Sequence, residues 1–235
     1  MIKKVLTLAT IAVMGLSVYG HNANTEADRV RDAGHVMSEI LNIPDNIPQS
    51  VLNKADCVVV LPSVLKAAFI VGGSYGRGVM TCRGGPHFTG HWGAPTMMAL
   101  EGGSFGLQIG AEATDFVLLL MSPRSAHAIL TSKVKLGADA SAAAGPVGRD
   151  ASAETDVTMR AEILSYSRAR GLFAGVSLEG STLRPDNEAN KNLYGKDLTA
   201  QQIVFQHAVA PPPSASLLLS VLNTRSPVNR SGKQV

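Results

Sequence analysis

Two apolar segments with closely spaced glycines constrain the fold of this chain most strongly. They run from 67 to 83 (AAFIVGGSYGRGVMTCR) and from 96 to 121 (TMMALEGGSFGLQIGAEATDFVLLLM), and both are poor in helix signals. Each contains a similar stretch, GGSYGRGV at 72–79 and GGSFGLQI at 102–109. Glycines inside strands mark bulges, bends or close backbone approach. We therefore predict a strongly curved, Gly-rich, mainly antiparallel sheet, either a half-barrel or a small barrel.

Several short helices are predicted to pack on this sheet. The first covers 25–42, where apolar residues recur at intervals of three and four and Thr25 is placed to cap the helix. Others are predicted at 48–54, 123–132, 186–193 and 199–207. Ser122 is placed to cap the helix at 123–132, and Thr199 is placed to cap the helix at 199–207. Shorter strands are predicted at 57–61, 159–167 and 171–180, with a helix as the alternative at 159–167. The pattern indicates an α+β fold in a single domain.

The N-terminus has the pattern of a secretory signal peptide. Lys3 and Lys4 precede an apolar run over 5–18, which is too short to span a bilayer comfortably, and Gly20 fits the last position before a cleavage site. We therefore expect the protein to be exported, periplasmic or secreted, with a peripheral position at a membrane left open. An uncleaved anchor or a buried helix is the alternative.

Domain organisation follows from these signals. Residues 1–20 are expected to be removed, 21–205 to form the folded domain, and 206–235 to be a Pro-rich, partly disordered C-terminal tail. Within the tail, the stretch LLLSVL is predicted to dock as one helical turn.

Net charge argues against broad attraction to polyanions. The full chain has 21 basic and 18 acidic residues, but the body at 21–205 has 16 basic and 18 acidic ones. No nucleic-acid partner is therefore expected, and any anion binding by the body must come from a local patch.

The two cysteines, Cys57 and Cys82, are candidates for a disulfide in an oxidising compartment. The bond would stabilise the fold by about 3 kcal/mol on the chain-entropy estimate. Two buried free thiols are the alternative.

Two segments match the G-x-S-x-G pattern of serine hydrolases, at 72–76 and 102–106. In those enzymes the serine lies on a sharp turn between a strand and a helix. Here strand-like sequence continues past both serines, so no catalytic residue is predicted. A hydrolase using Ser104, with His127 or His207 as its base, is a distant alternative.

His87 and His91 lie four residues apart, which on a helix could bind a metal. Gly84, Gly85, Pro86 and Gly90 disfavour a helix there. We predict neither a metal site nor a cofactor.

A run of ordered motifs resembles the SYLF domain, over roughly residues 25–205. They are KADCVVVLPSVLKAAFIVGGSYGRGVMTCR at 54–83, WGAP at 92–95, GGSFGLQIGAEATDFVLLL at 102–120, LGADASAAAGPVGRDASAETD at 136–156, SYSRARGLFAGVSLEGS at 165–181 and NLYG at 192–195. The resemblance implies a mixed α/β single domain without enzymatic activity.

Eukaryotic SYLF proteins bind phosphoinositides and some bind actin filaments, whereas bacterial relatives are exported or envelope proteins described as lipid-binding. The resemblance therefore implies binding to an anionic phospholipid of the phosphatidylinositol type, or to a membrane surface. Actin is not expected as a partner in the exported setting, and protein partners are unknown. The candidate lipid contacts, chosen for charge near the family motifs, are Lys133, Lys135, Arg149, Arg168 and Arg170.

The alternative is a structural or protein-interaction module of the envelope without lipid activity. The first helix favours this alternative, because residues 26–39 have four acidic and two basic side chains. Helices that lie on membranes usually have a polar face rich in Lys and Arg.

Overall fold

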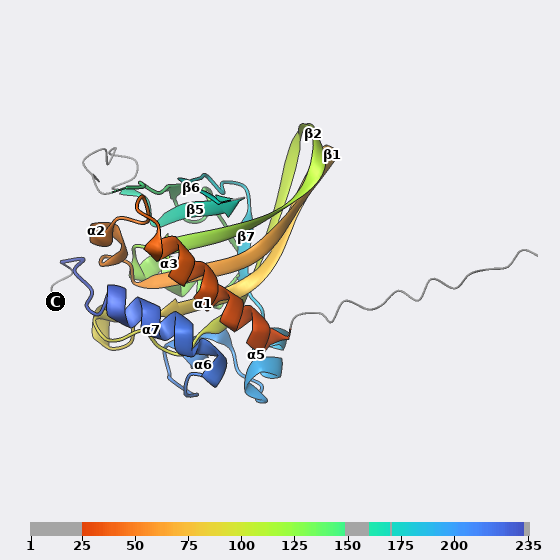
Figure 1. Ribbon diagram of the computed structural model, residues 1–235. Helices are drawn as coiled ribbons and strands as arrows, with labels where there is room; N and C mark the ends of the chain where they lie inside the picture. Colours follow the sequence, from red (N-terminus) through yellow and green to blue (C-terminus); the bar gives the residue numbers. More distant parts are fainter. Residues whose placement is uncertain (1–24, 149–159, 170, 233–235) are drawn as a thin grey trace, which may run out of the picture.

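The computed structural model describes residues 25–148, 160–169 and 171–232, with the backbone alone described for 67–72 and 104–111. The predicted signal peptide lies outside these residues. The elements in chain order are α1 (Glu26–Asn42), α2 (Gln49–Leu52), β1 (Cys57–Cys82), η1 (Pro86–Phe88), β2 (Thr96–Leu120), α3 (Pro123–Thr131), β3 (Val134–Lys135), β4 (Ala142–Ala144), β5 (Ile163–Ala169), β6 (Leu172–Gly175), β7 (Thr182–Pro185), α5 (Asn187–Tyr194), α6 (Ala200–Val204), η3 (Pro213–Ala215) and α7 (Ser216–Arg225) (Figure 1).

The described strands form one strongly curved sheet that is antiparallel except where β4 joins β5. Its order is β3-β7-β2-β5-β4, with β1 paired to β2 and β6 paired to β5. The predicted α+β class and curved antiparallel sheet are confirmed.

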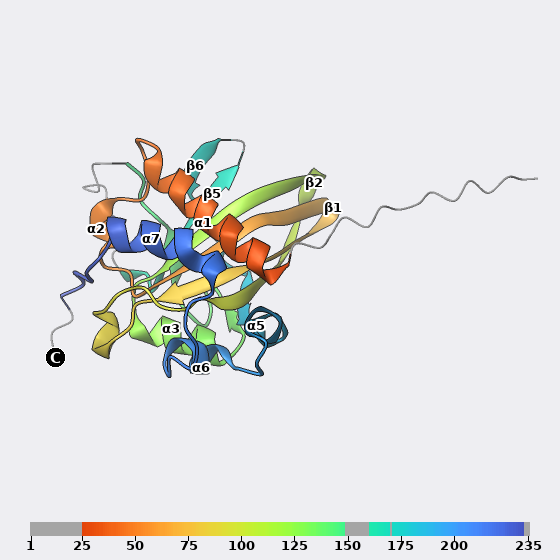
Figure 2. The same cartoon turned by 60° about the horizontal axis from the view of Figure 1, so that its bottom comes forward.

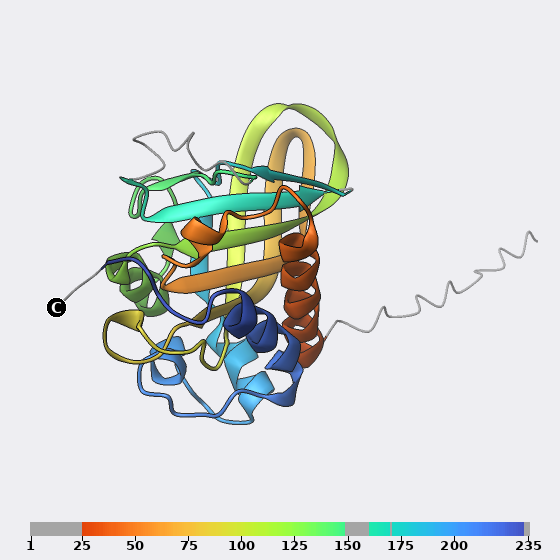
Figure 3. The same cartoon turned by 60° about the vertical axis from the view of Figure 1, so that its left-hand side comes forward.

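The two long strands pair with each other almost from end to end and then turn back together (Figure 3). Cys57 pairs with Leu120 at one end, and Met80 pairs with Thr96 at the other. In between, the two similar sequence stretches face each other, since Gly73 pairs with Gly103 and the two Gly-Gly-Ser stretches run antiparallel. The repeat in the sequence therefore reflects antiparallel pairing of two like segments.

Fold-back of β1 brings its two halves into close contact. A Cβ atom on Gly78 would overlap the carbonyl oxygen of Val60 and lie 2.7 Å from the Cα of Leu61. Only glycine leaves room for this approach, as predicted for glycines inside curved strands.

In the body of the molecule both faces of the sheet are buried, which explains why the strand sequences there are apolar without alternation. Along β1, Val58 and Val60 belong to one hydrophobic core, whereas Val59 and Leu61 belong to the other. Helices α1 and α7 cover the first face, and α3 and α6 cover the second (Figure 2).

The capping signals of the sequence are confirmed in the helices. Thr25 and Asp28 form a complete capping box at α1, and Thr199 and Gln202 form one at α6. The side chain of Ser122 accepts a hydrogen bond from the Ser125 N–H at the start of α3.

Beyond residue 205, the chain contains more structure than one docked turn. Helix α7 has ten residues, and its Leu218 and Leu222 are fully buried. It packs along α1 at Gly34, where a Cβ would lie 2.9 Å from the Leu218 backbone nitrogen. The prediction of a single helical turn was too short, because contacts with α1 rather than local sequence signals hold this helix.

Candidate functional site

One part of the sheet is a two-stranded projection of β1 and β2. Strand β2 pairs with β7 up to Glu101 and with β5 from Asp115 onward, so residues 102–114 have β1 as their one strand neighbour within the described chain. We call residues 62–75 of β1 and 102–114 of β2 the ribbon. It extends away from the helices in Figures 1 and 3.

Ion pairs mark both points where β2 leaves the body. On one side, Arg184 of β7 donates to Glu101 through Nε at 2.9 Å and Nη2 at 2.8 Å, and the Lys133 Nζ lies 3.4 Å from the same carboxylate. These hydrogen bonds from Arg184 lower the pKa of Glu101 below its ordinary value, with Lys133 contributing. The ion pairs fix the position at which the ribbon begins.

On the other side, Arg168 of β5 donates to Asp115 through Nε at 3.0 Å and Nη2 at 2.7 Å, and also binds Glu39 of α1. Partial burial alone would lower the pKa of this guanidinium, but the hydrogen bonds to Glu39 and Asp115 raise it. Asp115 also accepts the N–H of Ser63, a residue with φ 51° at a register shift in β1. This shift re-aims β1 as it enters the ribbon.

Large nonpolar side chains are exposed on the ribbon. Leu65 is 61% exposed and Tyr75 is 48% exposed, whereas Val64 and Gly76 next to them are buried. The Lys66 ammonium lies 4.6 Å from the centre of the Phe116 ring, so it is held against the body. Exposed nonpolar side chains on a projecting strand pair are available for contact with a partner.

The basic side chains predicted to bind lipid do not gather into one free cluster among the described residues. Arg168 and Lys133 are the cations of the two ion-pair sites, at opposite sides of β2. Lys135 is exposed on β3, where its N–H donates to Asp139. Arg149 and Arg170 lie outside the described residues. The sequence therefore located charged positions but not their acidic partners.

The candidate nucleophile Ser104 lies inside β2, where it pairs with Gly72. Strand β2 continues to Leu120, so the sharp turn into a helix that a hydrolase needs does not follow this serine. Its candidate bases, His127 and His207, line a hollow beside α3 and α6 instead. For the described residues, no three His, Cys, Asp or Glu side chains are arranged to hold a metal ion.

Cys57 and Cys82 form the predicted disulfide, which joins the first residue of β1 to its last. Next to it, the buried Arg83 guanidinium donates to the Ala55 oxygen at 3.0 Å and to the Ser226 Oγ at 2.5 Å. Its guanidinium carbon lies 4.2 Å from the centre of the Trp92 ring. Burial lowers the pKa of Arg83 to about 10, so it stays charged at neutral pH. This cluster stabilises the end of the strand pair at Cys57 and Cys82, which we call the base of the strand pair.

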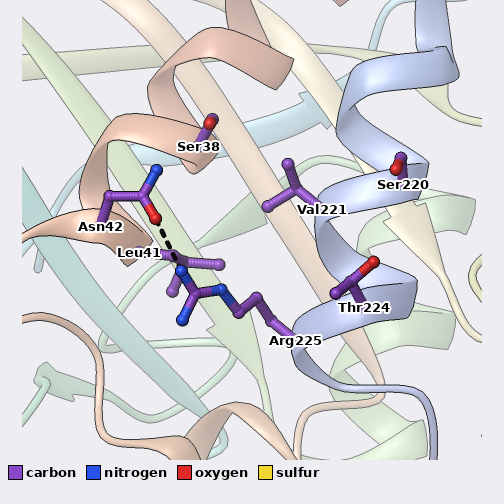
Figure 4. Close-up of a pocket in the computed structure, with 7 residues that line it drawn as sticks. All are labelled: Ser38, Leu41, Asn42, Ser220, Val221, Thr224 and Arg225. Carbon is purple, nitrogen blue, oxygen red and sulfur yellow. Dashed lines mark hydrogen bonds between the residues drawn. The ribbon is translucent and has the colours of Figure 1, made fainter.

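A second surface feature is a polar groove between α1 and α7 (Figure 4). Arg225 reaches across it and donates to the Asn42 Oδ1 at 2.6 Å, and Ser38, Ser220 and Thr224 present hydroxyl groups around it. The hydrogen bond connects the ends of two packed helices. The groove is therefore explained by helix packing.

The geometry defines an α+β domain with a projecting strand pair, anchored by ion pairs to a disulfide-closed body. No helix within the described part of the chain is long and nonpolar enough to cross a bilayer. The sequence pattern of the Ysc84 family, described as Las17-binding protein actin regulator, matches residues 101–225. The chain belongs to this family, and the SYLF resemblance is confirmed.

Named relatives come from yeasts and animals. Protein YSC84 of Saccharomyces cerevisiae is 35% identical over 192 residues, which are 80% of this chain and 40% of the relative. The SH3 domain-containing YSC84-like protein 1 of Rattus norvegicus is 35% identical over 207 residues, which are 86% of this chain and 59% of the relative. LAS seventeen-binding protein 3 of S. cerevisiae is 34% identical over 192 residues, which are 80% of this chain and 41% of the relative. The chain thus spans about half the length of these relatives.

The comparisons overturn the expectation about partners. An anionic phospholipid or membrane surface was expected, and actin was not. The family's description instead names Las17 and actin, and a yeast relative is named for binding Las17, so the partners named for the family are proteins. The error came from deriving the partner from the expected compartment rather than from the domain.

Proposed function

We propose that this chain is a non-enzymatic protein-binding domain and that the ribbon is its docking surface. The exposure of Leu65 and Tyr75 on a strand pair that projects from the body carries the proposal. Paired ion bridges at Glu101 and Asp115 support it, because they hold the ribbon in one orientation before a partner arrives. Preorganised surfaces lose less entropy on binding.

Filamentous actin is the first partner to test, because the family's description names actin. We further propose that the domain acts after export. The N-terminal Lys3, Lys4 and apolar run support export, and so does the disulfide, since such bonds persist in oxidising compartments.

The test is co-sedimentation of the purified protein with actin filaments. Leu65→Ser and Tyr75→Ser together should weaken binding roughly tenfold or more, because exposed nonpolar anchors dominate the energy of such contacts. Val228→Ser is the matched control: Val228 is 54% exposed but follows α7, outside the ribbon. It should bind like the unmodified protein.

Two results would contradict the proposal. Equal binding by the ribbon variant and the unmodified protein would remove the ribbon as the docking surface. If the unmodified protein does not bind actin, the double ribbon variant and the Val228→Ser control are compared by cross-linking with other proteins of the compartment in which the chain resides. Association only with anionic vesicles, insensitive to the ribbon variant, would replace the proposal with a lipid function.

A further inference from the structure

A small hollow lies on the opposite side of the sheet from α1 and α7, and three histidines line it. Its volume is about 150 Å³. The histidines come from three separate parts of the chain: His87 from η1, His127 from α3, and His207 from the segment after α6. Each of these side chains is exposed to solvent. Three histidines from distant segments of the chain thus line one hollow.

Aromatic side chains and a glycine fix the walls of the hollow. The His127 ring stacks on Phe205 with centroids 4.2 Å apart, and Phe205 meets Phe88 edge-on at 6.1 Å. On the remaining side, a Cβ on Gly84 would lie 3.5 Å from the His207 Cε1, so this imidazole sits directly over the Gly84 backbone. The rings of His127 and His207 are therefore held in place before any ligand binds.

Backbone strain is concentrated at the same place. Four non-glycine residues of the described chain have positive φ, and three of them line the hollow: His87 at 54°, Phe88 at 59° and His207 at 50°. The left-handed conformation costs about 1–2 kcal/mol for each such residue. Strained residues gather at ligand sites because the surrounding structure holds side chains where the ligand needs them.

The charges around the hollow favour an anion. No Asp or Glu is among its described lining residues, and the permanently charged group is Arg83. The Arg83 guanidinium turns into the core, where Ala55, Ser226 and Trp92 contact it and buried Asp56 lies close enough to act on its charge. Imidazole N–H groups are thus donors available to a ligand.

We propose that this hollow binds a small oxyanion, a phosphate or a carboxylate group, through the imidazoles of His87, His127 and His207. The size of the hollow supports a single such group, because pockets for larger organic ligands are typically about 300–1,000 Å³. The site lies outside the ribbon, so it goes beyond the proposed protein-binding function and can fail or succeed independently of it.

The experiment is an NMR titration of the full chain with inorganic phosphate and, separately, with acetate. Ionic strength is held constant with sodium chloride at pH about 6, where histidine side chains in general are partly protonated. The imidazole signals of the three pocket histidines should shift together and saturate with one dissociation constant. The signal of His35, an exposed histidine on α1, should stay in place. The lower of the two dissociation constants, for phosphate or for acetate, identifies the class of anion that the hollow binds.

The variant His207→Gly separates binding from folding. Glycine accepts the positive φ at this position, so the variant should be at least as stable as the unmodified protein in thermal unfolding. It should bind the anion roughly tenfold more weakly, because a hydrogen bond to a charged ligand is lost. His35→Ala should bind normally. Absence of saturable shifts with both anions, or equal shifts at His35, would overturn the proposal.

Discussion

In the body of the molecule, β1 and β2 are covered by helices on both faces, whereas in the ribbon each has the other as its strand neighbour. The body end is held further by the Cys57–Cys82 bond and by the buried Arg83. The ribbon instead exposes Leu65 and Tyr75. Two-stranded hairpins are marginal in water, so the ribbon depends on the body for its order. One pair of strands thus serves stability at its base and contact at its far part.

The largest effect is expected where the folded-back halves of β1 touch. Gly78→Ala places a methyl group against the Val60 carbonyl and the Leu61 backbone, and should lower the free energy of unfolding by about 3 kcal/mol or more. Urea unfolding measures the loss. Gly103→Ala in the ribbon is the control, because its methyl group would meet no described atom within 4 Å and should change stability by less than about 1 kcal/mol. Similar losses of stability at Gly78 and Gly103 would show that the body and the ribbon do not differ in how closely their strands are packed.

Removal of the disulfide should have the next largest effect. The bond closes a separation of 25 residues, and replacement of Cys57 and Cys82 by serine should cost about 3 kcal/mol. Urea unfolding of the double variant, beside the unmodified protein with and without reductant, measures it. Partner binding well below the unfolding transition should persist, because the ribbon does not include the bond. A loss of binding without a loss of stability would show that the base also shapes the ribbon.

Local sequence signals account for much of this fold. Caps at Thr25, Ser122 and Thr199 lie within three residues of the groups they bind, so the helix starts could be predicted. Helix α7 was underestimated because its apolar residues are stabilised by packing on α1, which no local pattern reveals. The same is true of the fold-back of β1, where Gly78 meets Val60 from the other half of the strand.

The site was harder to predict than the fold. Sequence identifies Arg168 as a charge, but its partner Asp115 is 53 residues away and becomes its neighbour through strand pairing. Leu65 stands in an apolar run that predicts a core position, and its exposure depends on the projection of the ribbon from the body, which no local pattern shows. The pocket histidines were each noticed, but their convergence depends on tertiary structure.

A moderate effect is expected at the Arg83 cluster. Ser226→Ala removes the hydroxyl that accepts from the Arg83 Nη2 and leaves a buried charged donor without that partner. The expected loss is about 2 kcal/mol in urea unfolding. Ser220→Ala, at an exposed position on α7, should stay within about 0.5 kcal/mol of the unmodified protein. Equal effects would show that the base tolerates an unpaired guanidinium donor.

The smallest effect should lie at the boundary between body and ribbon, in Glu101→Gln. Because the hydrogen bonds from Arg184 lower the pKa of Glu101 in the folded protein, the charged carboxylate stabilises folding above its unfolded pKa of about 4.3. This contribution is lost as the pH falls through the lower folded pKa. The side chain is partly exposed, so the difference at pH 7 should be under about 1 kcal/mol.

Urea unfolding of Glu101→Gln and unmodified protein at pH 7 and at pH about 3 tests this sign. The two proteins should differ at pH 7 and converge in acid. Partner binding at pH 7 should also weaken if the Glu101–Arg184 pair orients the ribbon, although Leu65 and Tyr75 are unchanged. Reduced binding with nearly normal stability would show that the Glu101–Arg184 pair mainly orients the ribbon. A stability loss as large as that of Ser226→Ala would show that the pair mainly stabilises the fold.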